Sequence, residues 1–161
     1  MTIGVLFVCL GNICRSPTAH GVFAKKVADQ HFESLIRIDS AGTSDWHSGS
    51  KPDSRATAAA ANKGYDLSSL RARSVTVDDF DQFDFILAMD RQNLTDLQIL
   101  CPQNFDGELA LFLDYADDLE DKEVPDPYYN DRRGEGFVQV LAMIEQASDG
   151  LLTHILRRHR L

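Results

Sequence analysis

The stretch "VLFVCLGNICRSPTAH", residues 5–20, decides the fold of this chain, because a strand, a short loop and a helix start follow one another within it. It continues the apolar run "TIGVLFVC", whose Val and Ile content is typical of a strand covered on both faces. Ser16 and Pro17 then predict a helix start, with a hydroxyl N-cap followed by proline at the first helical position. Apolar residues continue at helical spacing: Ala19, Val22, Phe23 and Val27.

Strands and helices alternate along the rest of the chain. The apolar runs "LIRIDSAG", "FDFILAM" and "GELALFL" predict three more strands. An alanine-rich helix is expected from Arg55 to Lys63, with Gly64 ending it, and Asp90 is expected to cap another. The final helix carries an apolar stripe, and Gly150 within it suggests a kink. The stripe consists of Phe137, Leu141, Ile144, Leu151 and Ile155.

This alternation predicts one α/β domain over residues 1–161, with a four-stranded, twisted parallel sheet flanked by helices on both faces, as in Rossmann-like folds. Ligands of such sheets bind outside the carboxyl ends of the strands. Cys9 and Ser40 both fall at those ends.

The loop between Cys9 and Ser16 has the composition of an anion site. Gly11 tolerates positive φ, and Asn12 is among the few other residue types that do. Such a loop can turn several N–H groups inward, and the following helix dipole adds to their field. Arg15 can fork onto two oxygens of a phosphate-like group. A cysteine at the base feels the same field, which favours a thiolate nucleophile.

Composition excludes several other classes. A net charge of −9 argues against nucleic acid as a partner. The apolar run from Ile3 to Leu10 is too short for a membrane helix and lacks the basic leader of a signal peptide, so a cytoplasmic protein without a membrane partner is expected. Three cysteines fit neither a disulfide framework nor a zinc site, and no metal or other cofactor is expected. "GNICRS" also lacks the features of nucleotide-binding loops.

The stretch "VCLGNICRSPTAHGVF" resembles the signature of the low-molecular-weight protein tyrosine phosphatases, Cys-x5-Arg-Ser near the N-terminus. The resemblance extends to "IDSAGTSDWHSG", "DFILAMDRQNL" and "VPDPYYND", and so covers nearly the whole chain. It implies a phosphotyrosine phosphatase I-like fold and hydrolysis of phosphotyrosine or aryl phosphates.

The resemblance implies a role for each residue of the loop. Cys9 would attack phosphorus and form a cysteinyl-phosphate, while Arg15 would hold the equatorial oxygens. The backbone N–H groups of residues Leu10, Gly11, Asn12, Ile13, Cys14 and Arg15 would share that task. The hydroxyl of Ser16 can donate to the sulfur. Asp126, between two prolines, matches the general acid that protonates the leaving phenolate and then activates water.

Other matched positions surround the site. Trp46, Tyr128 and Tyr129 are expected to wall the cleft, with Ile13 on its rim, and a deep aromatic cleft favours phosphotyrosine over phosphoserine. Ser40 resembles a residue that hydrogen-bonds the loop asparagine. Many relatives carry histidine at the position of Leu70, so one support of Asn12 is expected to be missing. These supporting positions are Ser40, Asn12 and Leu70.

Cys14, five residues after Cys9, matches a cysteine that traps the oxidised nucleophile as a disulfide; the alternative is a small apolar filler of the loop. Two rival functions stay open. A thiol-coupled arsenate reductase shares the Cys-x5-Arg loop but needs further cysteines, and no cysteine lies between Asp78 and Met89. The other rival is a non-catalytic oxyanion-binding or redox-sensing module.

Expected partners are a phosphotyrosine protein or a small aryl or acyl phosphate. The oligomeric state is open between a monomer and a weak dimer, because no apolar surface stripe can be separated from the core.

Overall fold

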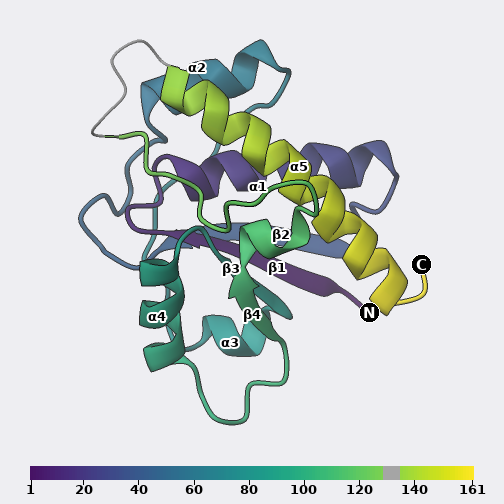
Figure 1. Ribbon diagram of the computed structural model, residues 1–161. Helices are drawn as coiled ribbons and strands as arrows, with labels where there is room; N and C mark the ends of the chain where they lie inside the picture. The colour runs from purple at the N-terminus through teal and green to yellow at the C-terminus, as the bar shows by residue number, and fades with distance from the viewer. Residues whose placement is uncertain (129–134) are drawn as a thin grey trace.

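Four parallel strands form the central sheet in the order β2-β1-β3-β4 (Figure 1). They are β1 (Ile3–Cys9), β2 (Ile36–Gly42), β3 (Phe85–Ala88) and β4 (Glu108–Leu111). The computed structural model describes residues 1–128 and 135–161. Every side chain of β1 is buried, which explains why its sequence is a continuous apolar run rather than an alternating one. The predicted four-stranded parallel sheet is confirmed.

Helices cover both faces of the sheet (Figure 1). One face carries α1 (Arg15–Asp29), α2 (Ser54–Asn62) and α5 (Glu135–Arg158), and the other carries α3 (Asp79–Gln82) and α4 (Arg91–Leu100). None of the helices in the described part of the chain combines the length and the apolar character that crossing a bilayer requires.

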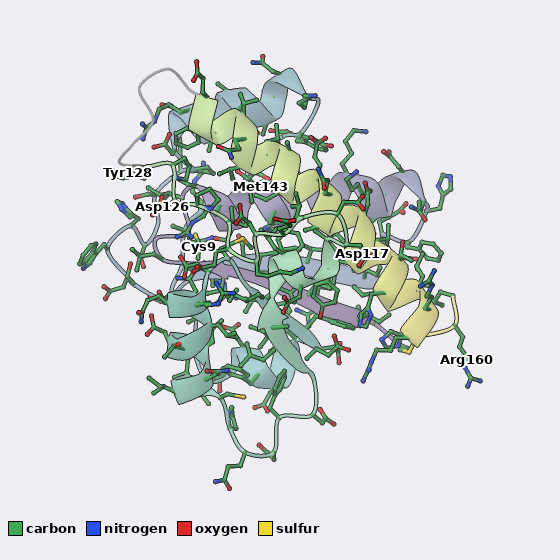
Figure 2. All side chains as sticks on the ribbon, viewed as in Figure 1. Cys9, Asp117, Asp126, Tyr128, Met143 and Arg160 are labelled. Carbon is green, nitrogen blue, oxygen red and sulfur yellow. The ribbon has the colours of Figure 1, made fainter. Side chains whose placement is uncertain are left out.

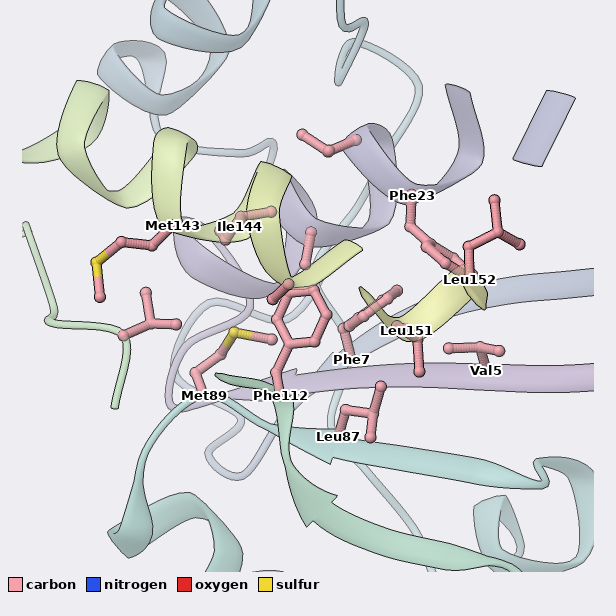
Figure 3. Packing of buried hydrophobic residues seen from close by; sticks show 14 of the residues in the cluster. Val5, Phe7, Phe23, Leu87, Met89, Phe112, Met143, Ile144, Leu151 and Leu152 are labelled. Atoms are coloured by element: carbon pink, nitrogen blue, oxygen red, sulfur yellow. The ribbon is translucent and has the colours of Figure 1, made fainter. Parts of the chain in front are cut away.

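Side chains of β1 enter two separate hydrophobic cores. Phe7 points toward α1 and α5, where its ring packs edge-on against Phe23 and Phe112 at centroid distances of 5.6 and 5.0 Å (Figure 3). Leu6 and Val8 point to the opposite face, into the cluster shared with α4. With a core on each side, β1 is fixed in register, so the loop that follows it starts from a rigid point.

The start of α1 differs from the sequence prediction. The helix begins at Arg15, with Cys14 at the N-cap position and no side-chain cap, so Pro17 is the third helical residue rather than the first. Ser16 does not cap the helix because its hydroxyl is bonded inside the loop, to Cys9 and Asn12. Pro17 is still accommodated, since the first helical turn has no use for its missing N–H.

The expectations for β4 and Gly150 also need correction. β4 ends at Leu111, and the chain then forms the 3₁₀ turn η1 (Phe112–Tyr115), which places Phe112 in the main core. α5 continues as one helix through Gly150. A Cβ there would lie 1.7 Å from the Tyr115 carbonyl oxygen, so the glycine is needed for the close approach of η1 to α5, not for a kink.

The strand order locates the binding crevice. β1 leads through α1 to β2 on one side, whereas β3 lies on the other side of β1. The order of the strands therefore reverses between β1 and β3, which is where open parallel sheets bind ligands at the carboxyl edge. The loop after Cys9 and the loop after Ala88 flank this point.

Candidate active site

A pocket opens at the carboxyl edge of the sheet, beside the end of β1. Figure 2 shows Cys9, Asp126 and Tyr128 at this end of the molecule. The pocket is lined by Cys9, Leu10, Gly11, Ile13, Cys14, Arg15, Ser44, Trp46, His47, Asp126 and Tyr128. Most of the residues singled out in the sequence thus lie on one surface, although they come from segments more than a hundred positions apart.

The loop from Cys9 to Arg15 forms the floor of the pocket. Asn12 adopts a φ of 56°, the left-handed conformation expected of it, and its N–H donates to Cys9 Sγ at 3.3 Å. Within the described residues, the N–H groups of Ile13, Cys14 and Arg15 donate to no protein acceptor, which leaves them available to an anion. Gly42 supports the loop from below, because a Cβ there would lie 2.7 Å from the Leu10 carbonyl oxygen.

A directed set of hydrogen bonds ends at the sulfur of Cys9. Asn12 Nδ2 donates to Ser16 Oγ at 2.7 Å and to Ser40 Oγ at 3.1 Å. Ser16 Oγ lies 3.0 Å from Cys9 Sγ, against 3.4 Å from the Ala41 carbonyl oxygen. The Asn12 amide occupies one acceptor site on Ser16, and the hydroxyl proton can point at the sulfur or at the Ala41 carbonyl oxygen. Ser16 is therefore placed to donate to the Cys9 sulfur.

Asn12 is fully bonded although residue 70 is leucine. The carbonyl oxygen Oδ1 of its side chain accepts the backbone N–H of Arg73 at 3.0 Å, so both ends of the amide are fixed. Ser40 Oγ in turn lies 3.3 Å from His20 Nδ1. Burial lowers the pKa of His20, and the nearby Asp39 offsets this only in part. Leu70 instead packs against the hydrophobic core.

Arg15 is buried and aimed by two oxygens. Its Nη1 donates to Asp90 Oδ2 at 2.7 Å and to the Val124 carbonyl oxygen at 3.1 Å, while the side chain is only 3% exposed. Burial opposes its charge, but the Cys9 sulfur and the bond to Asp90 outweigh burial and raise the pKa of Arg15. Asp90 also caps α4, as expected, by accepting the Asn93 N–H at 2.8 Å.

Asp126 faces the floor of the pocket from a loop without regular secondary structure. Its Oδ1 accepts the Tyr128 N–H at 3.0 Å, and its Oδ2 lies 3.6 Å from Arg15 Nη2. The carboxylate is one-third exposed, so it can exchange protons with solvent.

Aromatic side chains form the rim. Trp46 is 78% exposed, and Tyr128 lies against His47 at a ring-centroid distance of 6.2 Å. Ile13 is buried beside Tyr128, where the pocket wall meets a small core. Tyr129 lies outside the described residues.

Several residues of the site escaped the sequence analysis. Ser44 and His47 line the pocket, and Asp90 orients Arg15. Asp90 lies two residues after Ala88, the last residue of β3, so the rule for ligands at carboxyl edges could have found it. Within the ranges 1–128 and 135–161, no three His, Cys, Asp or Glu side chains are grouped to hold a metal ion.

The fold and this pocket define a class: an α/β protein with a cysteine at the floor of an anion-binding loop. Comparison with known proteins gives the family, since residues 4–161 match the model of the low molecular weight phosphotyrosine protein phosphatases. The low molecular weight protein-tyrosine-phosphatase YfkJ of Bacillus subtilis is 36% identical over 99% of both chains.

Solved structures of phosphatases have the same fold. A protein tyrosine phosphatase from Entamoeba histolytica with Hepes in its active site is 36% identical, with a TM-score of 0.91 over 99% of this chain and 100% of the other. The Drosophila arginine phosphatase is 29% identical, with a TM-score of 0.88 over 94% and 96% of the two chains. This chain belongs to the low molecular weight protein tyrosine phosphatase family, a family of hydrolases.

Proposed function

We propose that this protein hydrolyses phosphotyrosine in proteins, and small aryl or acyl phosphates, with Cys9 as nucleophile, Arg15 as oxyanion ligand and Asp126 as general acid and base. The convergence of these three side chains on one pocket carries the proposal. Family membership and the phosphatase names of its relatives support it.

In the first step, Cys9 Sγ attacks phosphorus while Asp126 gives its proton to the departing phenolate oxygen. Arg15 and the loop N–H groups neutralise charge on the equatorial oxygens. In the second step, Asp126 takes a proton from water, the water oxygen bonds to phosphorus, and the S–P bond breaks. The Ser16 hydroxyl, 3.0 Å from Sγ, stabilises the departing thiolate.

The rim supports an aromatic substrate. Ile13, Tyr128 and Trp46 offer apolar and aromatic surface above the phosphate position, and a phenyl ring gains more from such walls than a short serine side chain does. A phosphorylated guanidinium is polar, and the same walls favour it less.

The experiment that tests this function measures kcat/KM for phosphopeptides carrying phosphotyrosine, phosphoserine or phosphoarginine, together with p-nitrophenyl phosphate. Cys9→Ser is expected to abolish turnover, and Cys101→Ser, at a distant thiol, is expected to retain it. A chelator is expected to have no effect. Preference for phosphoarginine, or turnover that survives Cys9→Ser, contradicts the proposal.

The position of Cys101 also weighs against arsenate reduction. Cys101 follows the last residue of α4, whose ten residues separate it from Asp90 by roughly 15 Å. Asp90 contacts Arg15 in the pocket, so a relay of oxidation from the pocket to Cys101 would have to pass along the length of α4. Arsenate reduction in the presence of thiols serves as the second assay. If neither the phosphate esters nor arsenate are turned over, a non-catalytic oxyanion-binding or redox-sensing module becomes the better interpretation.

We also propose that Cys14 protects Cys9 from irreversible oxidation. Peroxide would convert the Cys9 thiolate to a sulfenic acid, and the Cys14 thiol would displace water from it to form a disulfide. Burial, followed by the charges of Asp53 and Cys9, raises the pKa of Cys14, so Cys14 stays protonated while Cys9 reacts first. Thiol reductant should restore activity to the peroxide-treated protein but not to Cys14→Ala.

We also propose a cellular location and an oligomeric state for this protein. Three free cysteines support a reducing, cytoplasmic location, which cell fractionation tests. We expect a monomer or a weak dimer in sedimentation experiments, and one phosphatase domain over residues 1–161, which the family match supports.

A further inference from the structure

The N-terminus of α2 lies between the phosphate-binding loop and the loop that carries Asp126. The backbone N–H of Asp53, the N-cap residue of α2, donates to the Ile13 carbonyl oxygen at 2.8 Å. Asp53 is thereby tied to the loop that follows β1. Its side chain then caps the helix by accepting the N–H of Arg55 at 2.8 Å.

Asp53 and Arg55 form a forked ion pair. Arg55 Nε donates to Asp53 Oδ1 at 3.1 Å, and Nη2 donates to Oδ2 at 3.0 Å. The Asp53 side chain is only 10% exposed. Burial opposes its charge, but the side-chain and backbone hydrogen bonds from Arg55 outweigh burial and lower the pKa of Asp53. The planar fork fixes the direction of the guanidinium.

The guanidinium reaches across to the second loop. Arg55 Nη2 also donates to the Tyr128 carbonyl oxygen at 3.2 Å. Its central carbon lies 5.5 Å from the centre of the Tyr128 ring and 4.6 Å from that of Phe137, at the start of α5. The N–H of the same Tyr128 donates to Asp126 Oδ1. A continuous set of bonds therefore runs from Ile13 through Asp53 and Arg55 to the carboxylate of Asp126.

Among the residues that the structure describes, contacts hold the Asp126 loop on each side of the carboxylate. On the N-terminal side, Val124 donates its N–H to the Met89 carbonyl oxygen at 2.8 Å and accepts from Arg15. On the C-terminal side, Arg55 donates to the Tyr128 carbonyl oxygen. Between them, Asp126 Oδ2 lies 3.6 Å from Arg15 Nη2, so the carboxylate stands beside the guanidinium of the phosphate-binding loop.

We propose that Arg55 is a positioning residue for the general acid, holding Asp126 through Tyr128 at a fixed place relative to the phosphate-binding loop. This inference rests on the proposed function. Arg55 does not line the pocket, so it acts on the leaving group through Asp126 and not by contact with substrate.

The test compares two substrates in Arg55→Met, a variant that keeps an unbranched side chain but loses the fork. Protonation of the leaving group contributes about 10²–10⁴-fold to such reactions, and it matters most for a basic phenolate. We therefore expect kcat/KM to fall about tenfold or more for phenyl phosphate and clearly less for p-nitrophenyl phosphate, whose leaving group is more acidic. Arg71→Met, at an exposed arginine that donates only to nearby carbonyl oxygens, is the matched control.

A double-mutant cycle separates positioning from general loosening of the site. In an Asp126→Asn background, Arg55→Met should cause no further loss of kcat/KM, because the acid it positions is already absent. Equal losses for both substrates, or an undiminished loss in the Asp126→Asn background, would overturn the inference. If Arg55→Met does not fold, Arg55→Lys gives the same comparison, since an ammonium keeps the charge but cannot make the fork.

The outcomes distinguish failure of the proposed function from failure of the inference about Arg55. If the unmodified protein does not turn over either aryl phosphate, the proposed function fails. If it does, and Asp126→Asn shows the leaving-group dependence while Arg55→Met does not, the inference about Arg55 fails alone.

Discussion

Asp90→Asn tests whether the ion pair with Asp90 aims Arg15. One Asp90 oxygen caps α4 and the other accepts from Arg15, at 2.8 and 2.7 Å. Asparagine is an equally good N-cap, but with its oxygen used for the cap its NH₂ group faces the guanidinium, donor against donor. The substitution therefore removes the ion pair and leaves the cap intact.

The magnitude follows from burial. Breaking a fully buried pair by removing one partner costs about 3–5 kcal/mol. Arg15 is 3% exposed, but Asp90 is 22% exposed, and Arg15 keeps the Val124 carbonyl oxygen. We therefore expect Asp90→Asn to lower the free energy of unfolding by about 2–3 kcal/mol, below that range. Asp90→Ala should lose about 1 kcal/mol more, because it also removes the cap.

The effect on activity should be larger. Loss of one preorganised oxyanion donor costs about 10²–10³-fold in rate, and an Arg15 released from Asp90 is free to turn toward Asp126. Urea unfolding and kcat/KM for p-nitrophenyl phosphate measure the two effects. Asp96→Asn, on the same helix and bonded to Gln92, is the control. An Asp90→Asn protein with the stability and kcat/KM of the parent would refute this account of Arg15.

Three further predictions concern the supports of the site. The folded state resists protonation of the partly buried His20, whereas the unfolded chain binds that proton as pH falls through about 6.5, so stability should decrease between pH 7.5 and 5.5. Urea midpoints should show a smaller decrease for His20→Gln, and an equal one would exclude His20 as the source. Gly150→Ala should lower the melting temperature strongly, by about 3 kcal/mol or more in stability, because its Cβ would overlap the Tyr115 carbonyl oxygen; a protein of parental stability would show that η1 can move aside. Gly42→Ala should lower kcat/KM at least about tenfold by pushing Leu10 upward, and unchanged vanadate or phosphate inhibition constants would contradict this.

Sequence-based predictions were most accurate where the local residue pattern already reflects the tertiary surroundings of the segment. The run that forms β1 is apolar because two cores enclose it, so its composition alone indicates a strand. Asn12 was likewise recognisable, since few residue types adopt its positive φ.

Residues that act through distant partners could not be found in this way. Asp90 has the local appearance of a helix cap, and its bond to Arg15 joins positions 75 apart. Arg55 has the local appearance of a surface arginine at a helix start, and its contact with Tyr128 spans 73 positions. The prediction for Ser16 was wrong because it considered only local sequence. Serine is a common N-cap residue, but here the Ser16 hydroxyl is bonded to the Cys9 sulfur and Cys14 occupies the N-cap position.

Both chain ends lie at the edge of the sheet opposite to Cys9, as Figures 1 and 2 show together. Met1 is 80% and Leu161 44% exposed, so neither terminus is held inside a core. A fluorescent protein, an affinity tag or a surface linker attached at either position would project away from incoming phosphoproteins. Immobilised or fused versions of this enzyme should therefore keep access to bulky substrates.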